Sequence, residues 1–457
     1  MRTLEILSLI LLLMAIWFLF FNRGRTLFLL MLFFTILASI AQHFFEGFRW
    51  QLYIYIFLLP AIYLCHRIQK EHIRTNIKIL FGIWYTLAFV IPYIIPVFSL
   101  PKPKGESFVG TETFHWTDST REEWFTIEKA DDFREIMVQS WYPSDITQNK
   151  KVEPYMDFIE LRSKTIANAG GLPSFLPSHL NLIRTNSYSE VPCKIQKGGL
   201  PVIIFSHGIT GSRHLHQALF EHLSSHGYIV IALDHSYDSN LTVFPDGRIA
   251  DYRSELTAHP DSVQIRENQI NTRVQDIIFI LNQLTKIQNN EIRCPLSGNI
   301  NLEKVAIGGH SFGGATAIQS TKVDKRIQAC FVFDGWINPV PGQTIKSGLR
   351  KPFFAMGRPS WRESDYPDNY DLLNKLVSNS SEPNYNILIK NTLHLDYTDI
   401  PLYSPIIKYV MDVGDLPPST SHSLINQLTF AFLEVHLMGK PEQFYKSLLD
   451  NELIYVN

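Results

Sequence analysis

Residues 304–320 read KVAIGGHSFGGATAIQS, and they carry the strongest structural signal in this chain of 457 residues. Val305 to Ile307 has the composition of a buried strand, and the small residues after Ser311 suit a helix that packs closely on a sheet. Gly309 to Gly313 matches the pattern G-x-S-x-G, which alone arises by chance in roughly one chain in ten of this length. The strand before it and the helix after it make the match more specific, and predict a serine on a sharp strand-to-helix turn.

The glycines on either side of this serine have a physical reason. The serine backbone is strained at such a turn, and side chains at Gly309 and Gly313 would collide with neighbouring backbone. The turn lifts the Ser311 hydroxyl above the sheet edge, beside a helix N-terminus whose free N–H groups favour a developing negative charge. This arrangement predicts that Ser311 is a nucleophile. A glycine-rich helix start with a solvated serine is the alternative.

On both sides of this stretch, apolar segments alternate with segments of helical periodicity. Fully apolar strands between amphipathic helices indicate a parallel sheet covered on both faces. Residues 135–142 alternate and stop at Pro143, as an opening antiparallel strand would. The expected fold class is therefore α/β, of the α/β-hydrolase type with a mostly parallel sheet. The expected strands are 201–205, 228–233, 304–307, 329–333, 353–356 and 385–389, and the expected helices are 213–225, 268–284, 312–320 and 422–438.

A serine hydroxyl needs a base to take its proton, and that base needs a carboxylate to orient it. In this fold the acid and then the histidine follow the serine along the chain. Asp334 ends the strand 329–333, 23 residues after Ser311, and His394 lies in the loop after the strand 385–389. These positions predict a triad of Ser311, Asp334 and His394.

Other residues compete for these roles. Asp334 could instead cap the turn that follows it, while Asp396 and Asp399 fit less well as the acid because they follow the histidine. His310 lies inside the turn and His207 lies in a different loop, so neither is well placed as the base.

An oxyanion hole needs two N–H donors, one of them from the loop after an earlier strand. Phe205-Ser-His-Gly-Ile209 follows the first expected parallel strand, and Gly208 permits a turn that aims the next amide inward. The backbone N–H groups of Ile209 and Phe312 are therefore the expected donors. A plain turn at the strand end is the alternative.

The composition and charge of the chain argue against several other functions. Residues 101–457 carry 33 basic and 40 acidic side chains, so this part has no electrostatic reason to bind nucleic acid. His214 and His216 lie two apart, which on a helix puts them on different faces, so we expect no metal site and no cofactor. The four cysteines are too few for a disulfide framework, and a disulfide between Cys193 and Cys294 is left open.

The first hundred residues contain four apolar runs, at 6–21, 26–45, 50–65 and 79–100. Their lengths lie near the roughly 20 residues that a helix needs to cross a bilayer, so we expect about four spans, with three as the alternative. No small-residue cleavage site follows the first run, which argues against a cleaved secretory signal. The first and third connections carry six basic residues against four on the opposite side, which predicts both termini outside the cytoplasm and an extracytoplasmic catalytic domain; with three spans this orientation reverses. The six are Arg23, Arg25, Arg67, Lys70, Arg74 and Lys78, and the four are Arg2, Arg49, Lys102 and Lys104.

We therefore expect a membrane anchor at 1–100, a Pro-rich linker at 101–107 and a catalytic domain at 108–457. An insertion at about 144–195 interrupts that domain between the antiparallel strand and the parallel series. Its apolar, Pro-broken segment 172–183 is either a lid or lipid-facing cap over an ester pocket, or simple packing.

Five motifs of the chain belong together: FSHGI at 205–209, SHGYIVIALDH at 225–235, GGHSFGGA at 308–315, FDGW at 333–336 and TLH at 392–394. With these motifs the chain resembles the platelet-activating factor acetylhydrolases, in their plasma and type II intracellular forms, which are also classed as a phospholipase A2 group. The resemblance covers most of residues 108–437. The chain departs from the family pattern in two ways. It has Asp334-Gly335-Trp336 where a common version of the family has Asp-Ala-Trp, and its apolar front end has no counterpart in the secreted enzymes.

The resemblance implies calcium-independent hydrolysis of short-chain or oxidised sn-2 esters of phospholipids. It implies the same site residues, with Ser311, Asp334 and His394 as the triad. Two other functions remain alternatives. A membrane acyltransferase would use the same triad but deliver the acyl group to an alcohol or amine, and a catalytically silent hydrolase fold would serve as a membrane receptor or scaffold.

Overall fold

The computed structural model describes residues 1–21, 24–68, 73–126, 128–129, 131–145, 151–169, 171–254, 262–363, 368–381 and 383–456. Arg23 and Lys70, used above for the orientation, and residues 146–150 and 170 of the expected insertion lie outside these ranges. The chain divides into two compact units. The first comprises Met1–Ser99, Met156–Ile183 and Tyr403–Ile406, and the second comprises Leu100–Tyr155, Arg184–Leu402 and Ile407–Asn457.

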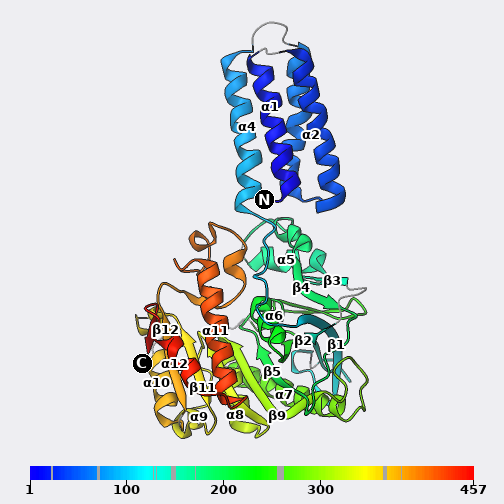
Figure 1. Cartoon of the computed structure of the whole chain (residues 1–457). Coiled ribbons are helices and arrows are strands. Elements are labelled where there is room, and N and C mark those ends of the chain that lie inside the picture. The colour runs from blue at the N-terminus through cyan, green and yellow to red at the C-terminus, as the bar shows by residue number, and fades with distance from the viewer. Residues whose placement is uncertain are drawn as a thin grey trace. The chain divides into compact units, whose positions relative to one another are not determined.

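Four long apolar helices dominate the first unit (Figure 1). Each is long and apolar enough to cross a membrane by length and composition, the third together with the 3-10 turn Trp50–Leu52 that precedes it. Leu12, Leu58 and Ala88 are fully buried between the helices, whereas many large apolar side chains, such as Phe57 at 60% exposure, point outward. An apolar outer surface of this kind is typical of helices that face lipid. The helices are α1 (Thr3–Phe21), α2 (Arg25–Glu46), α3 (Tyr53–Ile68) and α4 (Thr75–Ile94).

The apolar segment 172–183 belongs to the first unit, together with helix α5 (Ile159–Ala169). The indole Nε1 of Trp50, just before α3, donates a 3.1 Å hydrogen bond to the carbonyl of Leu176. The ring of Phe175 meets the Trp50 ring edge-on at 5.0 Å between centroids. The segment therefore packs on the helix ends of its own unit, and a role as a lid stays a prediction.

The second unit is built on an eleven-stranded sheet in the order β13-β12-β11-β10-β9-β5-β6-β2-β1-β4-β3. The six strands from β12 to β6 run parallel, while β2 and β13 pair antiparallel at either side of them. All six expected parallel strands and the expected antiparallel strand are present. The strands of this sheet are β1 (Phe108–Glu122), β2 (Phe133–Ser144), β3 (Lys151–Pro154), β4 (Arg184–Ser189), β5 (Leu200–Ser206), β6 (Ile229–Asp234), β9 (Ile300–His310), β10 (Ile327–Phe333), β11 (Phe353–Gly357), β12 (Asn384–Ile389) and β13 (Ile454–Val456).

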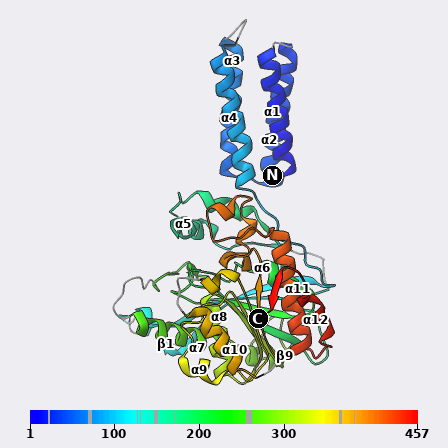
Figure 2. The same cartoon turned by 90° about the vertical axis from the view of Figure 1, so that its left-hand side faces the viewer.

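Two hydrophobic cores lie on the two faces of the sheet. Along β5, Val202 and Ile204 enter one core, while Ile203 and Phe205 enter the other, as the two-residue period of a strand requires. Figure 2 shows α7 and α8 on one side of the sheet and α11 and α12 on the other. The helices of this unit are α6 (Gln217–Ser225), α7 (Ser262–Gln288), α8 (Phe312–Val323), α9 (Gly342–Ser347), α10 (Asn369–Asn379), α11 (Pro418–His436) and α12 (Gln443–Leu449).

Some boundaries differ from the sequence-based expectation. The helix expected to begin at Arg213 begins at Gln217, because residues 209–216 form turns in which the Arg213 N–H donates a 2.8 Å hydrogen bond to Asp234 Oδ1. Strand β1 was not predicted, since its side chains follow no clean alternation and are buried irregularly. The short strands β7 (Leu241–Val243) and β8 (Ile249–Asp251) form a separate pair that was also missed.

Candidate active site

Ser311 lies on the sharp turn between β9 and α8. Its φ of 56° and ψ of −121° are strained for a residue with a side chain. The turn is held because the Ser311 N–H donates a 3.0 Å hydrogen bond to the carbonyl of Phe333 on the next strand. A Cβ at Gly309 would lie 2.1 Å from the Gly313 oxygen, and one at Gly313 would lie 2.0 Å from the Ser206 oxygen. Only glycine fits at both positions.

Asp334 and His394 meet at the same edge of the sheet. Asp334 directly follows β10, and His394 follows β12 in a short turn of helix. His394 Nδ1 donates a 2.5 Å hydrogen bond to Asp334 Oδ2. The Asp334 side chain is buried, while the His394 side chain keeps 23% of its exposure. A partly exposed imidazole oriented by a buried carboxylate is the arrangement that a general base requires.

The surroundings of Asp334 keep this carboxylate ionised. The backbone N–H of Arg358 donates a 2.8 Å hydrogen bond to Oδ1, and the guanidinium Nε lies 3.3 Å from Oδ2. Burial by itself raises the pKa of Asp334, but the hydrogen bond and charge of His394 and the charge of Arg358 outweigh it. The pKa of Asp334 is therefore lowered.

Neighbouring bonds link Ser311 to this pair. Its N–H is bonded to Phe333, the residue before Asp334, and His310 Nε2 donates a 3.0 Å hydrogen bond to the His394 carbonyl. Within the described ranges, Ser311 Oγ makes no hydrogen bond to His394. Such bonds are often long in a free enzyme and tighten when substrate binds, so the nucleophilic role of Ser311 stays a prediction.

The competing residues named above have other partners. Asp396 Oδ2 accepts hydrogen bonds from the backbone of Leu393 at 2.7 Å and of Gly414 at 2.6 Å. Asp399 accepts 2.8 Å and 3.3 Å bonds from the backbone N–H groups at the start of α6. Burial and the charge of His394 lower the pKa of His310 to about 3, so its ring stays neutral.

The loop after β5 lies against the serine turn. A Cβ at Gly208 would lie 3.2 Å from the Ser311 Cβ, so a side chain there would press on the serine. The N–H groups of Ile209 and Phe312 have no acceptor in the part of the chain that the structure describes. Both are therefore free to bind an oxygen atom, and their role as oxyanion donors stays a prediction.

A second serine–histidine–aspartate row lies behind this site and was missed from the sequence. Ser206 Oγ lies 3.0 Å from His235 Nε2, and His235 Nδ1 lies 2.9 Å from Asp276 Oδ2. All three side chains are fully buried, and burial lowers the pKa of His235 to about 4. No ester can reach Ser206, so this row ties β5 and β6 to α7 and does not rival Ser311.

The part of the chain that the structure describes contains neither a set of metal ligands nor a disulfide. Among the described residues, no cluster of three or more His, Cys, Asp or Glu side chains is arranged to hold a metal, and Cys193 and Cys294 are free thiols.

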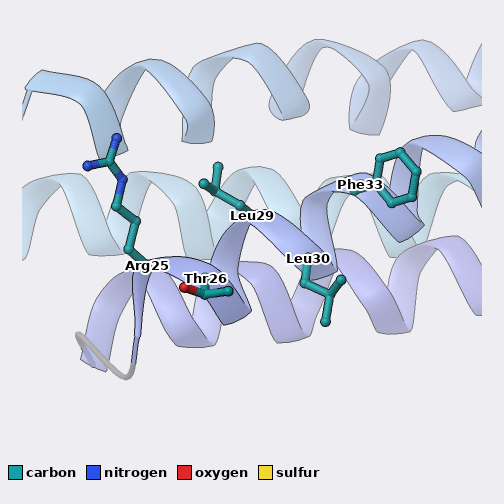
Figure 3. Close-up of a pocket in the computed structure, with 5 residues that line it drawn as sticks. All are labelled: Arg25, Thr26, Leu29, Leu30 and Phe33. Carbon is teal, nitrogen blue, oxygen red and sulfur yellow. The ribbon is translucent and has the colours of Figure 1, made fainter.

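Figure 3 shows an open groove on α2 in the first unit. Its lining contains one charged group and no nucleophile paired with a base, so it is not an ester-cleaving site. The lining residues are Arg25, Thr26, Leu29, Leu30 and Phe33.

A known protein family matches most of the chain. The family described as platelet-activating factor acetylhydrolase, isoform II, matches residues 99–451. The platelet-activating factor acetylhydrolase of Canis lupus familiaris is 28% identical over 277 residues, covering 55% of this chain and 61% of that protein. The probable 1-alkyl-2-acetylglycerophosphocholine esterase of Arthroderma benhamiae is 26% identical over 366 residues, covering 76% of this chain and 90% of that protein. The chain spans about three fifths of the length of the canine and bovine relatives.

A solved structure supports the fold. The ferulic acid esterase from Streptomyces cinnamoneus superposes with a TM-score of 0.63 at 24% sequence identity, covering 79% of this chain and 99% of that chain. This likeness and the sheet order confirm the predicted α/β-hydrolase fold.

Proposed function

The chain belongs to the platelet-activating factor acetylhydrolase isoform II family, as its motifs suggested, and on this premise we propose that it is a serine esterase. Its proposed substrates are short-chain or oxidised sn-2 esters of phospholipids, cleaved without calcium or a cofactor. The relatives named as platelet-activating factor acetylhydrolase and 1-alkyl-2-acetylglycerophosphocholine esterase support this substrate class. The observation that carries the proposal is the 2.5 Å bond from His394 Nδ1 to buried Asp334, at the sheet edge where Ser311 also lies.

The proposed cycle has two halves. Ser311 Oγ attacks the ester carbonyl carbon while His394 Nε2 takes the hydroxyl proton, and the carbonyl oxygen becomes an oxyanion held by the N–H groups of Ile209 and Phe312. When the carbon–oxygen bond breaks, His394 returns the proton to the leaving alcohol. Water then attacks the acyl-enzyme by the same route, which releases the carboxylic acid and restores Ser311.

Asp334 supports both halves of this cycle. Its hydrogen bond to Nδ1 fixes the imidazole tautomer that leaves Nε2 free to accept a proton. Its negative charge, kept by a lowered pKa, stabilises the imidazolium that forms in each half. A buried carboxylate interacts with that cation more strongly than a solvated one would.

The test of this proposal is hydrolysis of short p-nitrophenyl esters and of phospholipids with different sn-2 chains by the full chain. Ser311→Ala should lose ~10⁴-fold or more in kcat, as triad nucleophiles do. Normal hydrolysis by this variant would reject the assignment. A preference for long unoxidised sn-2 chains over acetyl would reject the substrate class alone. Product analysis with added alcohols would reveal acyl transfer.

The four apolar helices of the first unit support a further part of the proposal, that the chain is an integral membrane protein with the anchor at 1–100 and the catalytic domain at 108–457. The bias of Lys and Arg supports an extracytoplasmic catalytic domain. A membrane-impermeant fluorophosphonate should therefore label Ser311 in intact cells. Labelling only after the cells are broken would reverse the orientation.

A further inference from the structure

Arg273, on α7, lies directly beneath the loop that carries Ile209. Its side chain is almost fully buried. Nη1 donates a 2.6 Å hydrogen bond to the carbonyl of His207, and Nη2 lies 3.4 Å from the carbonyl of Gly208. One guanidinium thus binds the two carbonyls that come just before the Ile209 N–H.

The direction of these bonds matters for catalysis. The Gly208 carbonyl and the Ile209 N–H belong to one trans peptide unit, so they point in opposite directions. The same carbonyl also accepts a 2.6 Å hydrogen bond from His207 Nδ1 and a 3.1 Å bond from the Gly211 N–H. Donors on the buried side hold the carbonyl inward, and this turns the Ile209 N–H away from Arg273.

Arg273 also touches the other expected donor. The centre of its guanidinium lies 4.6 Å from the centroid of the Phe312 ring. A guanidinium over an aromatic face is an attractive contact, and it is stronger when both groups are buried, as they are here. One side chain therefore contacts the carbonyl of the peptide unit that carries the Ile209 N–H, and also the ring of Phe312.

The guanidinium itself is held in place. Its Nε donates to Asp238 Oδ2, and Gln269, one helical turn earlier on α7, donates to Asp238 Oδ1. His207 is braced as well, since its Nε2 accepts a 3.2 Å hydrogen bond from the His235 N–H and lies 2.8 Å from Ser239 Oγ. The rotamer of Arg273 is fixed by these partners before any substrate arrives.

We propose that Arg273 is a positioning residue for the oxyanion hole, which sets the direction of the Ile209 N–H through the His207 and Gly208 carbonyls and steadies Phe312 through its ring. This inference rests on the proposed esterase function. The charge on the substrate oxygen develops only in the transition state, so an N–H that is misaligned weakens the transition state and leaves ester binding nearly unchanged.

Arg273→Lys tests this role in the full chain. A lysine keeps the positive charge, but its compact ammonium cannot reach two carbonyls and Asp238 at once. We expect kcat to fall about 10- to 100-fold with KM nearly unchanged, somewhat less than the loss from deleting a donor. The affinity for a trifluoromethyl ketone should fall by the same factor, because its adduct with Ser311 places an oxyanion in the hole. The shape of the pH–rate profile should not change.

The matched control is Arg134→Lys. Arg134 is an equally buried arginine that pairs with Asp276 of the same helix and donates to the Ser236 carbonyl at 2.9 Å, without a contact to the loop among the described residues. All rates are taken per active site, as titrated with a fluorophosphonate. Arg134→Lys should lose stability and keep kcat within about twofold of the parent chain, because it lies away from the donors.

The inference is overturned if Arg273→Lys keeps kcat and ketone affinity per titrated site. It is also overturned if Arg134→Lys lowers both as much. If Arg273→Lys does not fold, Asp238→Asn decides instead, since it releases the guanidinium and should lower kcat and ketone affinity together. Retained activity in Ser311→Ala would reject Ser311 as the nucleophile, and no ester hydrolysis by the parent chain would reject the proposed esterase itself; both outcomes are distinct from all of these.

Discussion

His394 Nδ1 lies 2.5 Å from Asp334 Oδ2, although 60 residues separate the two along the chain. Each follows the carboxyl end of a parallel strand, and β11 lies between those strands in the sheet. Because the strands run parallel, their carboxyl ends share one edge, and side chains from distant segments meet there.

Asp334→Asn should reduce kcat by ~10⁴-fold while the protein stays folded, because an amide neither fixes the imidazole tautomer nor stabilises the imidazolium. Steady-state hydrolysis of a short p-nitrophenyl ester measures this. Asp412→Asn is the control, since Asp412 binds Arg358 at 2.6 Å and is 45% exposed. A loss of similar size in Asp412→Asn would show that the charge of Arg358, and not the bond to His394, governs the rate.

Ser206→Ala should keep fluorophosphonate labelling and esterase activity but lower the free energy of unfolding by about 1–3 kcal/mol. The reason is that it leaves the buried His235 Nε2 without its 3.0 Å partner. Labelling followed by peptide mass mapping, with thermal unfolding in detergent, measures both effects. If peptide mapping of the parent chain finds the label on Ser206 and not on Ser311, the roles of the two serines have been assigned the wrong way round.

Gly313→Ala should abolish most activity and destabilise the fold by about 1–3 kcal/mol or more, because the added Cβ would lie 2.0 Å from the Ser206 oxygen. Backbone on both sides would have to move, and the serine turn would move with it. Gly342→Ala is the matched control, since nothing lies within 4 Å of its Cβ position. Equal effects of the two substitutions would argue against close packing at the turn.

His310→Gln should become less destabilising relative to the parent chain as the pH falls from 7 to 5. The unfolded chain binds a proton on His310 near pH 6.5, whereas the folded chain, with a pKa of about 3, does not. Between these values the parent chain loses about 1.4 kcal/mol of stability per pH unit through this group. Glutamine does not titrate, and its amide keeps a donor for the His394 carbonyl.

The quantity to measure is the difference in the free energy of unfolding between His310→Gln and the parent chain, which should narrow as the pH falls. Thermal unfolding of both full chains in detergent at pH 7, 6 and 5 measures it. The pH–rate profile provides a separate readout, because a neutral His310 contributes no titration to it. A constant difference across this range would show that His310 titrates with the same pKa in the folded and unfolded chains, and a widening difference would show that it is protonated in the folded protein.

The amino-acid pattern alone was enough to predict the strand–serine–helix turn and the parallel sheet, which the structure contains, and it predicts Ser311, Asp334 and His394 as a triad in that order. These features are local or follow from topology, since a two-residue period, a glycine spacing and the common edge of parallel strands can all be read along the chain. The same reasoning found the four apolar helices, whose signal is continuous hydrophobicity.

Which polar side chains meet could be seen only in the folded structure. It joined Ser206, His235 and Asp276 from β5, the end of β6 and α7, and it brought Arg273 under the loop of Ile209. It also showed that Asp396 accepts hydrogen bonds from backbone N–H groups, whereas His394 is hydrogen-bonded to Asp334. Such contacts join residues tens of positions apart, and their hydrogen bonds depend on distances of a few tenths of an ångström. No sequence period encodes such distances, which arise only when packed helices and strands fix each side chain in space.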